Sequence, residues 1–300
     1  MNPTQKFFSK IGFNYLIFGI CTIVFQIIII NILSKTNPSL VSDINLITSI
    51  SSLCNYILPF PILYWLMKKL ESNKLEKHDS NTKTFITYIG ITLTLMWIGN
   101  LIGLLITNLL SGAIQNDIAN PVHNLINSTD IWLNLLLISI IAPICEEIIF
   151  RKLIIDRTIK YGANVSIVLS AVIFALFHGN LNQFFYALLI GGFFSYIYIK
   201  TGKIVYPIIL HIIVNTMGSV ASLIFAQAVS NLQTAVNPLE LAFILIYIII
   251  VFSSFIIGAW GLSRFRPQKL EHSLKTVFFN PGMICFIGFF IIIFIRQILF

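Results

Sequence analysis

Charged residues are scarce in this 300-residue sequence: they make up 10% of the chain, whereas hydrophobic residues make up 57%. Soluble domains usually carry about 25% charged residues, so the composition excludes a water-soluble globule. The apolar residues also form long runs, such as 11–33 and 239–262, each close to the roughly 20 residues that a helix needs to cross a bilayer. The sequence therefore predicts an all-α, polytopic transmembrane helical bundle.

Several other signals are missing. The four cysteines form no CxxC pair and no Cys/His cluster of zinc-finger spacing, so they are expected to be small apolar residues rather than metal ligands. The net charge of +8 is not arranged as a basic stripe interleaved with stacking aromatics, which argues against a nucleic-acid partner. No A-x-A site follows the first apolar run, so a retained first helix is expected.

The hydrophobic pattern indicates about eight or nine spans. They are predicted near 11–33, 45–67, 85–111, 131–155, 163–179, 181–199, 204–228, 239–262 and 283–299. Only Gly179-Asn180 separates the fifth span from the sixth. A break or re-entrant turn at that point is therefore as consistent with the sequence as two full crossings.

Positive charge alternates between the connecting segments. If the N-terminus is cytoplasmic, 16 of the 19 basic residues lie on that side: Lys6, Lys10, Lys68, Lys69, Lys74, Lys77, Lys83, Lys152, Arg157, Lys160, Lys200, Lys203, Arg264, Arg266, Lys269 and Lys275. Loops 112–130 and 229–238 on the other side contain no Lys or Arg. The positive-inside rule thus predicts a multi-pass protein with a cytoplasmic N-terminus. Its abundance of Ile, Asn and Lys is typical of a bacterial protein, so we expect the bacterial cell membrane and its lipids as surroundings.

The polar, turn-rich loop 112–130 is a natural divider. The three spans before it carry no ionisable residue deep in the membrane, whereas spans four to seven carry all of these energetically costly groups. We therefore predict N-terminal spans in 1–130, a functional core in 131–220 and C-terminal spans in 221–300.

Span four places three charged side chains together. Glu147 and Arg151 are four residues apart in the favourable acid-first order, so they are expected to pair. Glu146 points elsewhere around the helix and remains the free carboxylate. Ionisable groups inside a membrane are usually functional, although a structural salt-bridge network is the alternative explanation.

Two further helices carry candidate partners. Phe174 and His178 share a face at the end of the fifth span, and His211 and Asn215 share a face in the seventh. Each pair alone is consistent with interhelical hydrogen bonding. Three such clusters on nearby helices favour a common site.

These side chains suffice to hydrolyse an amide bond. Glu146, assisted by His178, could take a proton from water and deliver it to the leaving amine, while His211 and Asn215 stabilise the oxyanion. Alternatively, Glu146, His178 and His211 could bind a divalent metal such as zinc and leave one position open for water. The sequence does not distinguish the two mechanisms.

Other protease chemistries lack their signatures. There is no His-Glu-x-x-His motif, no aspartate deep in a span, and no Gly-x-Ser-x-Gly around the mid-span residues Ser170 and Ser195. Ser170 is expected to serve packing.

The ordered motifs Glu146-Glu147-x-x-x-Arg151, Phe174-x-x-x-His178 and His211-x-x-x-Asn215 resemble those of the CPBP family, the CAAX prenyl endopeptidase and bacteriocin-processing (Abi) group of intramembrane proteases. The resemblance covers roughly residues 131–220. It implies a water-filled active-site cavity that opens toward the cytoplasm. By position, Glu146 would be the catalytic glutamate, His178 its water-activating partner, and His211 with Asn215 the oxyanion-stabilising pair. Glu147, Arg151 and Phe174 would support the site.

The resemblance also implies a membrane-associated peptide or protein substrate. Bacterial family members are linked to bacteriocin self-immunity, peptide export and pheromone maturation, and both metal-dependent and metal-independent mechanisms are described. A non-catalytic immunity or scaffold protein, which binds a partner and only inherits the fold, is the main alternative. An ion or proton-coupled transporter is a third class, but no inverted repeat or pair of interrupted helices supports it.

One geometric conflict remains at this stage. Measured from a turn near 156–162, Glu146 lies about ten residues into span four and His178 about sixteen into span five, a depth difference of roughly 9 Å. The two side chains meet only if span four continues as a helix past Asp156 or if span five is strongly tilted.

Overall fold

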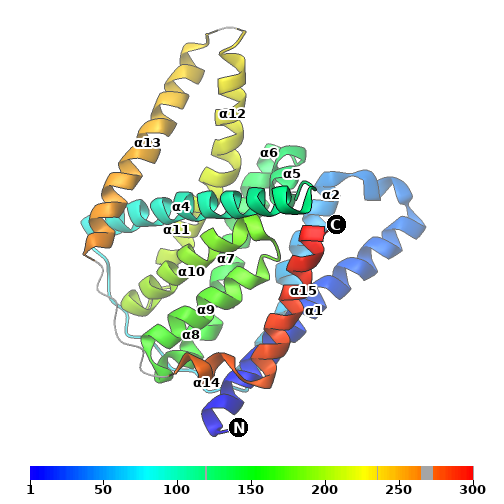
Figure 1. The fold of residues 1–300 in the computed structure, drawn as a ribbon, viewed down its shortest axis with the longest axis vertical. Helices are drawn as coiled ribbons and strands as arrows, with labels where there is room; N and C mark the ends of the chain where they lie inside the picture. The colour runs from blue at the N-terminus through cyan, green and yellow to red at the C-terminus, as the bar shows by residue number, and fades with distance from the viewer. Residues whose placement is uncertain (119, 235, 265–272, 300) are drawn as a thin grey trace.

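The computed structural model describes residues 1–118, 120–234, 236–264 and 273–299. These residues form helices and connecting loops, without a strand (Figure 1). The α-helices are α1 (Pro3–Thr36), α2 (Ile44–Ser52), α3 (Phe60–Lys68), α4 (Thr82–Ile114), α5 (Pro121–Ser128), α6 (Ile131–Leu133), α7 (Ala142–Glu146), α8 (Leu153–Thr158), α9 (Ala163–Phe177), α10 (Leu181–Thr201), α11 (Val205–Thr216), α12 (Ser222–Asn231), α13 (Pro238–Ser263), α14 (Leu274–Phe278) and α15 (Pro281–Leu299). The predicted all-α class is confirmed.

Several of these helices join end to end, and eight of the resulting segments in the described chain are long and apolar enough to cross a membrane. They are Pro3–Thr36, Ile44–Lys68, Thr82–Ile114, Ile131–Tyr161, Leu181–Thr201, Val205–Asn231, Pro238–Ser263 and Pro281–Leu299. The predicted multi-pass bundle of eight or nine spans is confirmed. Arg266 and Lys269, which belong to the predicted basic loops, lie outside the described residues.

The fifth predicted span, α9, is shorter than the others. Its 15 residues extend about 22 Å at 1.5 Å per residue, less than the roughly 30 Å of a hydrocarbon core. The chain then reverses at Gly179, whose φ of 63° lies in the left-handed region that glycine adopts at little cost. Asn180 starts α10 by accepting a hydrogen bond from the backbone N–H of Gln183. His178 is thereby placed on a turn inside the bundle.

Helix α10 is central to the packing. It lies between α9 and α4, while α4 also packs along α13, and α1 packs along α15. Close approach depends on small residues, as in other membrane bundles: a Cβ at Gly99 of α4 would collide with the backbone of Tyr186 of α10. In Figure 1, α12 and α13 form a hairpin that projects from the rest of the bundle.

The depth conflict is resolved by the length of span four. Its helix continues past Asp156 through α8 to Thr158 and ends in a 3₁₀ turn, Ile159–Tyr161. Glu146 then lies 15 residues before Tyr161, and His178 lies 15 residues after Ala163. Both side chains are therefore about 22 Å from the turn, and the first of the two expected solutions is confirmed.

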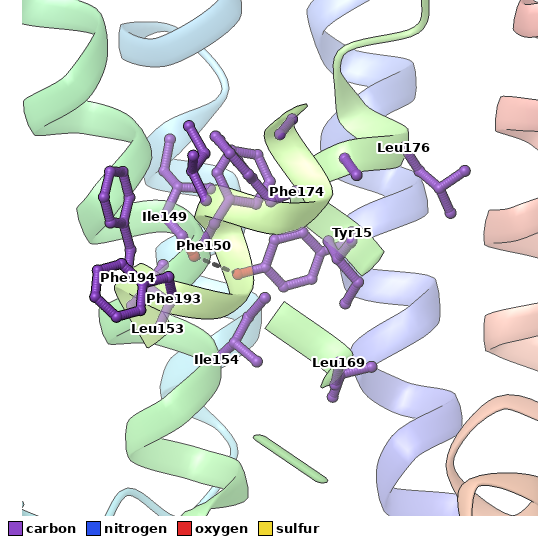
Figure 2. Packing of buried hydrophobic residues seen from close by; sticks show 14 of the residues in the cluster. Tyr15, Ile149, Phe150, Leu153, Ile154, Leu169, Phe174, Leu176, Phe193 and Phe194 are labelled. Atoms are coloured by element: carbon purple, nitrogen blue, oxygen red, sulfur yellow. Dashed lines mark hydrogen bonds between the residues drawn. The ribbon is translucent and has the colours of Figure 1, made fainter. Parts of the chain in front are cut away.

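An apolar core supports span four from one side. Figure 2 shows Tyr15 of α1 directed at the backbone of Ile149, to whose carbonyl its hydroxyl donates a 2.5 Å hydrogen bond. Phe150, Phe174 and Phe194 are nearly or fully buried in the same cluster. Because burial of large aromatic side chains dominates core energetics, this cluster fixes the position of the charged segment that precedes α8.

Candidate active site

The predicted ion pair of span four is confirmed and includes a histidine. Oε2 of Glu147 lies 3.1 Å from Nε of Arg151, and both side chains are fully buried. Oε1 of the same carboxylate lies 2.7 Å from Nδ1 of His211. Because a carboxylate accepts, Nδ1 of His211 carries the proton in this contact. Glu147 therefore holds both the arginine and the histidine ring in place.

Phe174 lies at the centre of the charged groups. The guanidinium carbon of Arg151 is 3.9 Å from the centroid of the Phe174 ring, which is cation–π geometry. The same ring meets His178 edge to face at 4.6 Å and His211 at 5.8 Å between centroids. One aromatic side chain thus contacts the arginine and both histidines, which gives the supporting position predicted for Phe174 a physical basis.

Glu146 lies apart from the ion pair, as its place on the helix predicts. The hydroxyl of Tyr56 donates a 2.5 Å hydrogen bond to Oε1 of Glu146. Oε2 lies 3.5 Å from Nε2 of His211. Glu146 is therefore held by a tyrosine from span two and faces the second nitrogen of the histidine that Glu147 orients.

His178 is oriented by its own helix. Its Nδ1 lies 2.9 Å from the backbone carbonyl of Phe174, and a carbonyl can only accept, so Nδ1 is the donor. In the neutral ring Nε2 then has a free lone pair, which can take a proton from water or from Glu146. A histidine needs this tautomer to assist a carboxylate base.

Asn215 is fixed by one of its two amide hydrogens. Nδ2 donates to the backbone carbonyl of Ile138 at 2.8 Å. One turn further on, Ser219 contacts Ser139 at 2.9 Å between hydroxyl oxygens. These two contacts tie span seven to the first half of span four, so the amide of Asn215 is positioned by neighbouring backbone.

Local widening of the helices coincides with the site. Four segments have π-helical hydrogen bonding: Leu53–Ile57, Asn134–Ile141, Glu147–Lys152 and Met217–Ala221. They contain Tyr56, the carbonyl that fixes Asn215, the Glu147–Arg151 pair and Ser219. π-Helical turns are rare and often occur at functional sites. Here they change which side chains face the centre of the bundle.

The candidate residues line one cavity of about 760 Å³. Glu146, His178, His211 and Asn215 lie on its wall together with Tyr56 and Tyr186, whereas Glu147 and Arg151 do not. The structure thus brings the four predicted catalytic residues together and places the ion pair behind them. The volume is within the range of sites that hold small ligands.

The direction of this cavity sets two expectations against each other. The sequence predicts a cytoplasmic N-terminus, and the family resemblance implies a cavity that opens toward the cytoplasm. The lining residues of span two are Thr48 to Tyr56, and those of span seven are His211 to Ala226. In both spans these residues lie on the side away from the basic loops. If the N-terminus is cytoplasmic, the basic loops are cytoplasmic too, and the cavity then cannot open toward the cytoplasm. The two expectations are therefore incompatible in this fold.

The predicted metal set meets only part of the requirements of zinc. Each histidine has its Nδ1 engaged by an oxygen acceptor, and this arrangement leaves Nε2 for a ligand, as is common around metals. However, no three His, Cys, Asp or Glu side chains among the described residues are grouped closely enough to hold a metal ion. A metal site at Glu146, His178 and His211 therefore stays a prediction.

Two tyrosines of the site were missed in the sequence. Tyr56 contacts Glu146, and the ring of Tyr186 lies 6.1 Å from that of His178. Tyrosine is common at membrane interfaces and in apolar runs, so neither residue stands out by composition. The available signal was the polar pair Asn55-Tyr56 within a predicted membrane span.

The remaining polar residues of the core have structural roles. Ser195 donates to the hydroxyl of Ser170, and Ser170 donates to the carbonyl of Phe150, at 2.9 and 2.8 Å. The packing role predicted for Ser170 is confirmed. All four cysteines are free, as expected from their apolar surroundings.

Comparison with known proteins confirms the resemblance. Residues 128–217 match the family model described as Type II CAAX prenyl endopeptidase Rce1-like. The sequence is also similar to "Putative membrane peptidase YdiL" of Bacillus subtilis (strain 168), with 37% identity over 82 residues, which is 26% of this chain and 32% of that protein. The chain thus matches about a third of that relative's length. No solved structure matches.

The matched stretch contains all three motifs. This part of the chain is therefore similar to type II CAAX prenyl endopeptidases and to the membrane peptidase relative. Tyr56 lies outside it, and the division of the chain at residues 130 and 220 stays a prediction.

Proposed function

We propose that this protein is an intramembrane endopeptidase that hydrolyses a peptide bond in a membrane-associated peptide or protein. The observation that carries the proposal is the position of Glu146: its carboxylate lies on the cavity wall, outside the Glu147–Arg151 pair, and faces Nε2 of His211 at 3.5 Å. The match of residues 128–217 to a prenyl endopeptidase family supports the same reaction class.

In the proposed reaction Glu146 is the general base. It removes a proton from a water molecule in the cavity, and the water oxygen attacks the carbonyl carbon of the substrate. The Nε2 lone pair of His178 holds the same water and shares the proton. When the tetrahedral intermediate collapses, the C–N bond breaks and the proton passes from Glu146 to the leaving amine.

The oxyanion receives its hydrogen bonds from the opposite wall. The amide hydrogen of Asn215 that does not bind Ile138 is one donor, and the imidazole of His211 is the other. Donors held by the protein before the reaction need no reorganisation, which is the main advantage of such sites. Glu147 supports this role because it fixes Nδ1 of His211.

A metal at Glu146, His178 and His211 stays a separate prediction, and the reaction above has no step that depends on it. Metal analysis of purified protein tests this prediction directly. About one zinc per chain, lost in Glu146→Ala and His178→Ala but kept in Asn100→Ala, supports the metal set. Absence of metal together with intact cleavage excludes it.

The test of function is a comparison of terminal peptides in membrane and secreted fractions. Cells express wild type, Glu146→Ala or the control Glu71→Ala at matched levels; Glu71 is an exposed loop carboxylate paired with Lys160. New termini are expected with wild type and with the control, and not with Glu146→Ala. If termini are the same in all cells while a protective phenotype persists in Glu146→Ala, the non-catalytic immunity or scaffold function replaces the protease.

A further inference from the structure

The cavity follows a consistent direction in every span that lines it. From the level of Glu146, its wall continues along Ala142 to Leu137 in span four, along Gln183 to Asn180 at the start of α10, and along Thr22 to Gln26 in α1. Within the described residues, its wall does not include the segments from Arg151 to Tyr161, from Ala187 to Thr201 or from Val205 to Leu210. The cavity therefore occupies one half of the bundle.

The two ends of the bundle can be identified by contacts between loops. At one end the basic segments meet: Lys203 contacts Asp79, and Lys160 contacts Glu71. At the other end the hydroxyls of Thr48 and Thr129 lie 3.1 Å apart, which joins the start of span two to loop 112–130. That loop has no Lys or Arg, and its acidic residues are Asp117 and Asp130. We call these the basic end and the non-basic end.

An aromatic layer closes the cavity on the side of the basic end. The ring of Phe177 lies 5.1 Å from Phe18, 5.2 Å from Phe150 and 4.9 Å from Phe290 between centroids. All four rings also belong to the cavity wall. Beyond them lies the apolar core around Tyr15 and Ile149. Such tightly packed rings leave no room for a peptide.

The cavity is open at the non-basic end. Asn120 and Asn127, which lie on loop 112–130, line the cavity and are exposed. Between them and Glu146 the wall is formed by neutral side chains such as Ser52, Asn55, Gln26 and Ser222. Among the described lining residues there is no Lys, Arg or Asp, and Glu146 is the single carboxylate.

We propose that the cavity receives an uncharged, extended polypeptide segment from the non-basic end of the bundle, which the positive-inside rule predicts to be non-cytoplasmic. The inference rests on the protease function proposed above and adds the side of access and the class of substrate. Amide and hydroxyl side chains can pair with main-chain N–H and C=O groups of an extended segment. The wall contains no Lys or Arg to pair with an aspartate of that segment, and a lysine could pair only with Glu146, the proposed base. Either charge would therefore enter the cavity at a high desolvation cost.

The size of the cavity limits the segment to a few residues. A volume of about 760 Å³ corresponds to a ligand of small-molecule size and excludes a folded domain. The fitting substrate is a short, flexible stretch next to a membrane anchor or at the end of a secreted peptide, on the non-cytoplasmic face.

Access can be measured without knowledge of the substrate. In the protein with its four cysteines replaced by alanine, a single cysteine is placed in the cavity (Ser52→Cys), at the mouth at the non-basic end (Asn127→Cys) or in the basic loop (Lys74→Cys). A sulfonated, membrane-impermeant maleimide is added to intact cells and to inverted vesicles. Ser222→Cys is a second cavity position if Ser52→Cys does not fold.

We expect Ser52→Cys and Asn127→Cys to react in intact cells, and Lys74→Cys to react only in inverted vesicles. Because a charged reagent does not cross the hydrocarbon core, the labelling rate of each cysteine should differ about tenfold or more between the two preparations. If the cavity cysteine reacts only in inverted vesicles, as Lys74→Cys does, the proposal is overturned. It is also overturned if the cavity cysteine reacts in neither preparation while Asn127→Cys does.

The terminal-peptide comparison separates this inference from the proposed function. Cleavage positions that depend on Glu146 are expected in neutral stretches on the non-cytoplasmic side of their proteins. If cleavage that depends on Glu146 is confined to cytoplasmic segments, the proposed protease function stands and the proposed side of access is refuted. Absence of any dependent cleavage refutes the protease, whereas the labelling result still decides from which side the cavity opens.

Discussion

Tyr56 and Glu146 are joined by a 2.5 Å hydrogen bond between the tyrosine hydroxyl and carboxylate Oε1. The two residues are 90 positions apart in the chain, and only Glu146 lies in the stretch that matches the prenyl endopeptidase model. The N-terminal spans therefore contribute directly to the surroundings of the proposed base.

Removal of that hydroxyl should impair catalysis without unfolding the protein. Tyr56→Phe keeps the ring and loses the donor, so Glu146 is less well positioned, and we expect kcat to fall roughly 10- to 100-fold with little change in KM. Tyr64→Phe, on the same span but 48% exposed, is the matched control. Kinetics on a substrate identified from terminal peptides provide the measurement, and equal kcat values for the two variants would contradict a positioning role.

The two glutamates should differ in their effect on folding. Glu147→Gln leaves the fully buried Arg151 without its carboxylate, and Arg151→Ala leaves the fully buried Glu147 with His211 as its remaining contact. Breaking a buried ion pair costs about 3–5 kcal/mol. Glu146→Gln removes a charge that borders the cavity and should leave the thermal midpoint nearly unchanged while activity is lost. Membrane levels and melting of the purified variants test this difference. Similar midpoints for all three proteins would show that the ion pair does not support the fold.

Phe174 should contribute both to the stability of the fold and to activity. Phe174→Leu removes the ring that contacts Arg151 at 3.9 Å, and a desolvated cation–π contact contributes about 2 kcal/mol. It also removes the edge contact that fixes His178. We expect a lower melting temperature and a lower kcat, with Phe255→Leu, an exposed phenylalanine of α13, as control. Unchanged kcat in a destabilised protein would indicate that Phe174 serves only packing.

The loop at the basic end should loosen in acid. The hydrogen bond from Lys203 holds the pKa of Asp79 below its ordinary value of 3.8, so the contact stabilises the folded loop above that pH and is lost as the pH falls through the lowered value. Asp79→Asn should have the same effect at neutral pH. Limited proteolysis between residues 69 and 81 measures it, with Lys74→Gln as control, and equal cleavage rates would count against this anchor.

Much of the site could be predicted from helical periodicity. The positions of Glu147 and Arg151, four residues apart, determine their pairing, and the same geometry leaves Glu146 free. The spacings of Phe174 with His178 and of His211 with Asn215 likewise place each pair on one face. These are local relationships within single helices, so a regular helix suffices to derive them.

Relationships between helices could not be derived in the same way. The contact of Tyr56 with Glu146 depends on how spans two and four pack, and the π-helical turn Leu53–Ile57 shifts the face that Tyr56 presents. The direction of the cavity depends on where the aromatic rings of four helices meet. Neither property leaves a periodic pattern in the chain.

The ring layer of Phe18, Phe150, Phe177 and Phe290 also bears on energy conservation in the cell. A hydrated cavity that reached from one face of the bilayer to the other would leak ions and dissipate the membrane potential. Here the cavity ends at packed aromatic rings, and the free energy of moving a bare ion past them is high because the ion loses its hydration. Water for hydrolysis can therefore be present deep in the membrane while the electrochemical gradient is maintained.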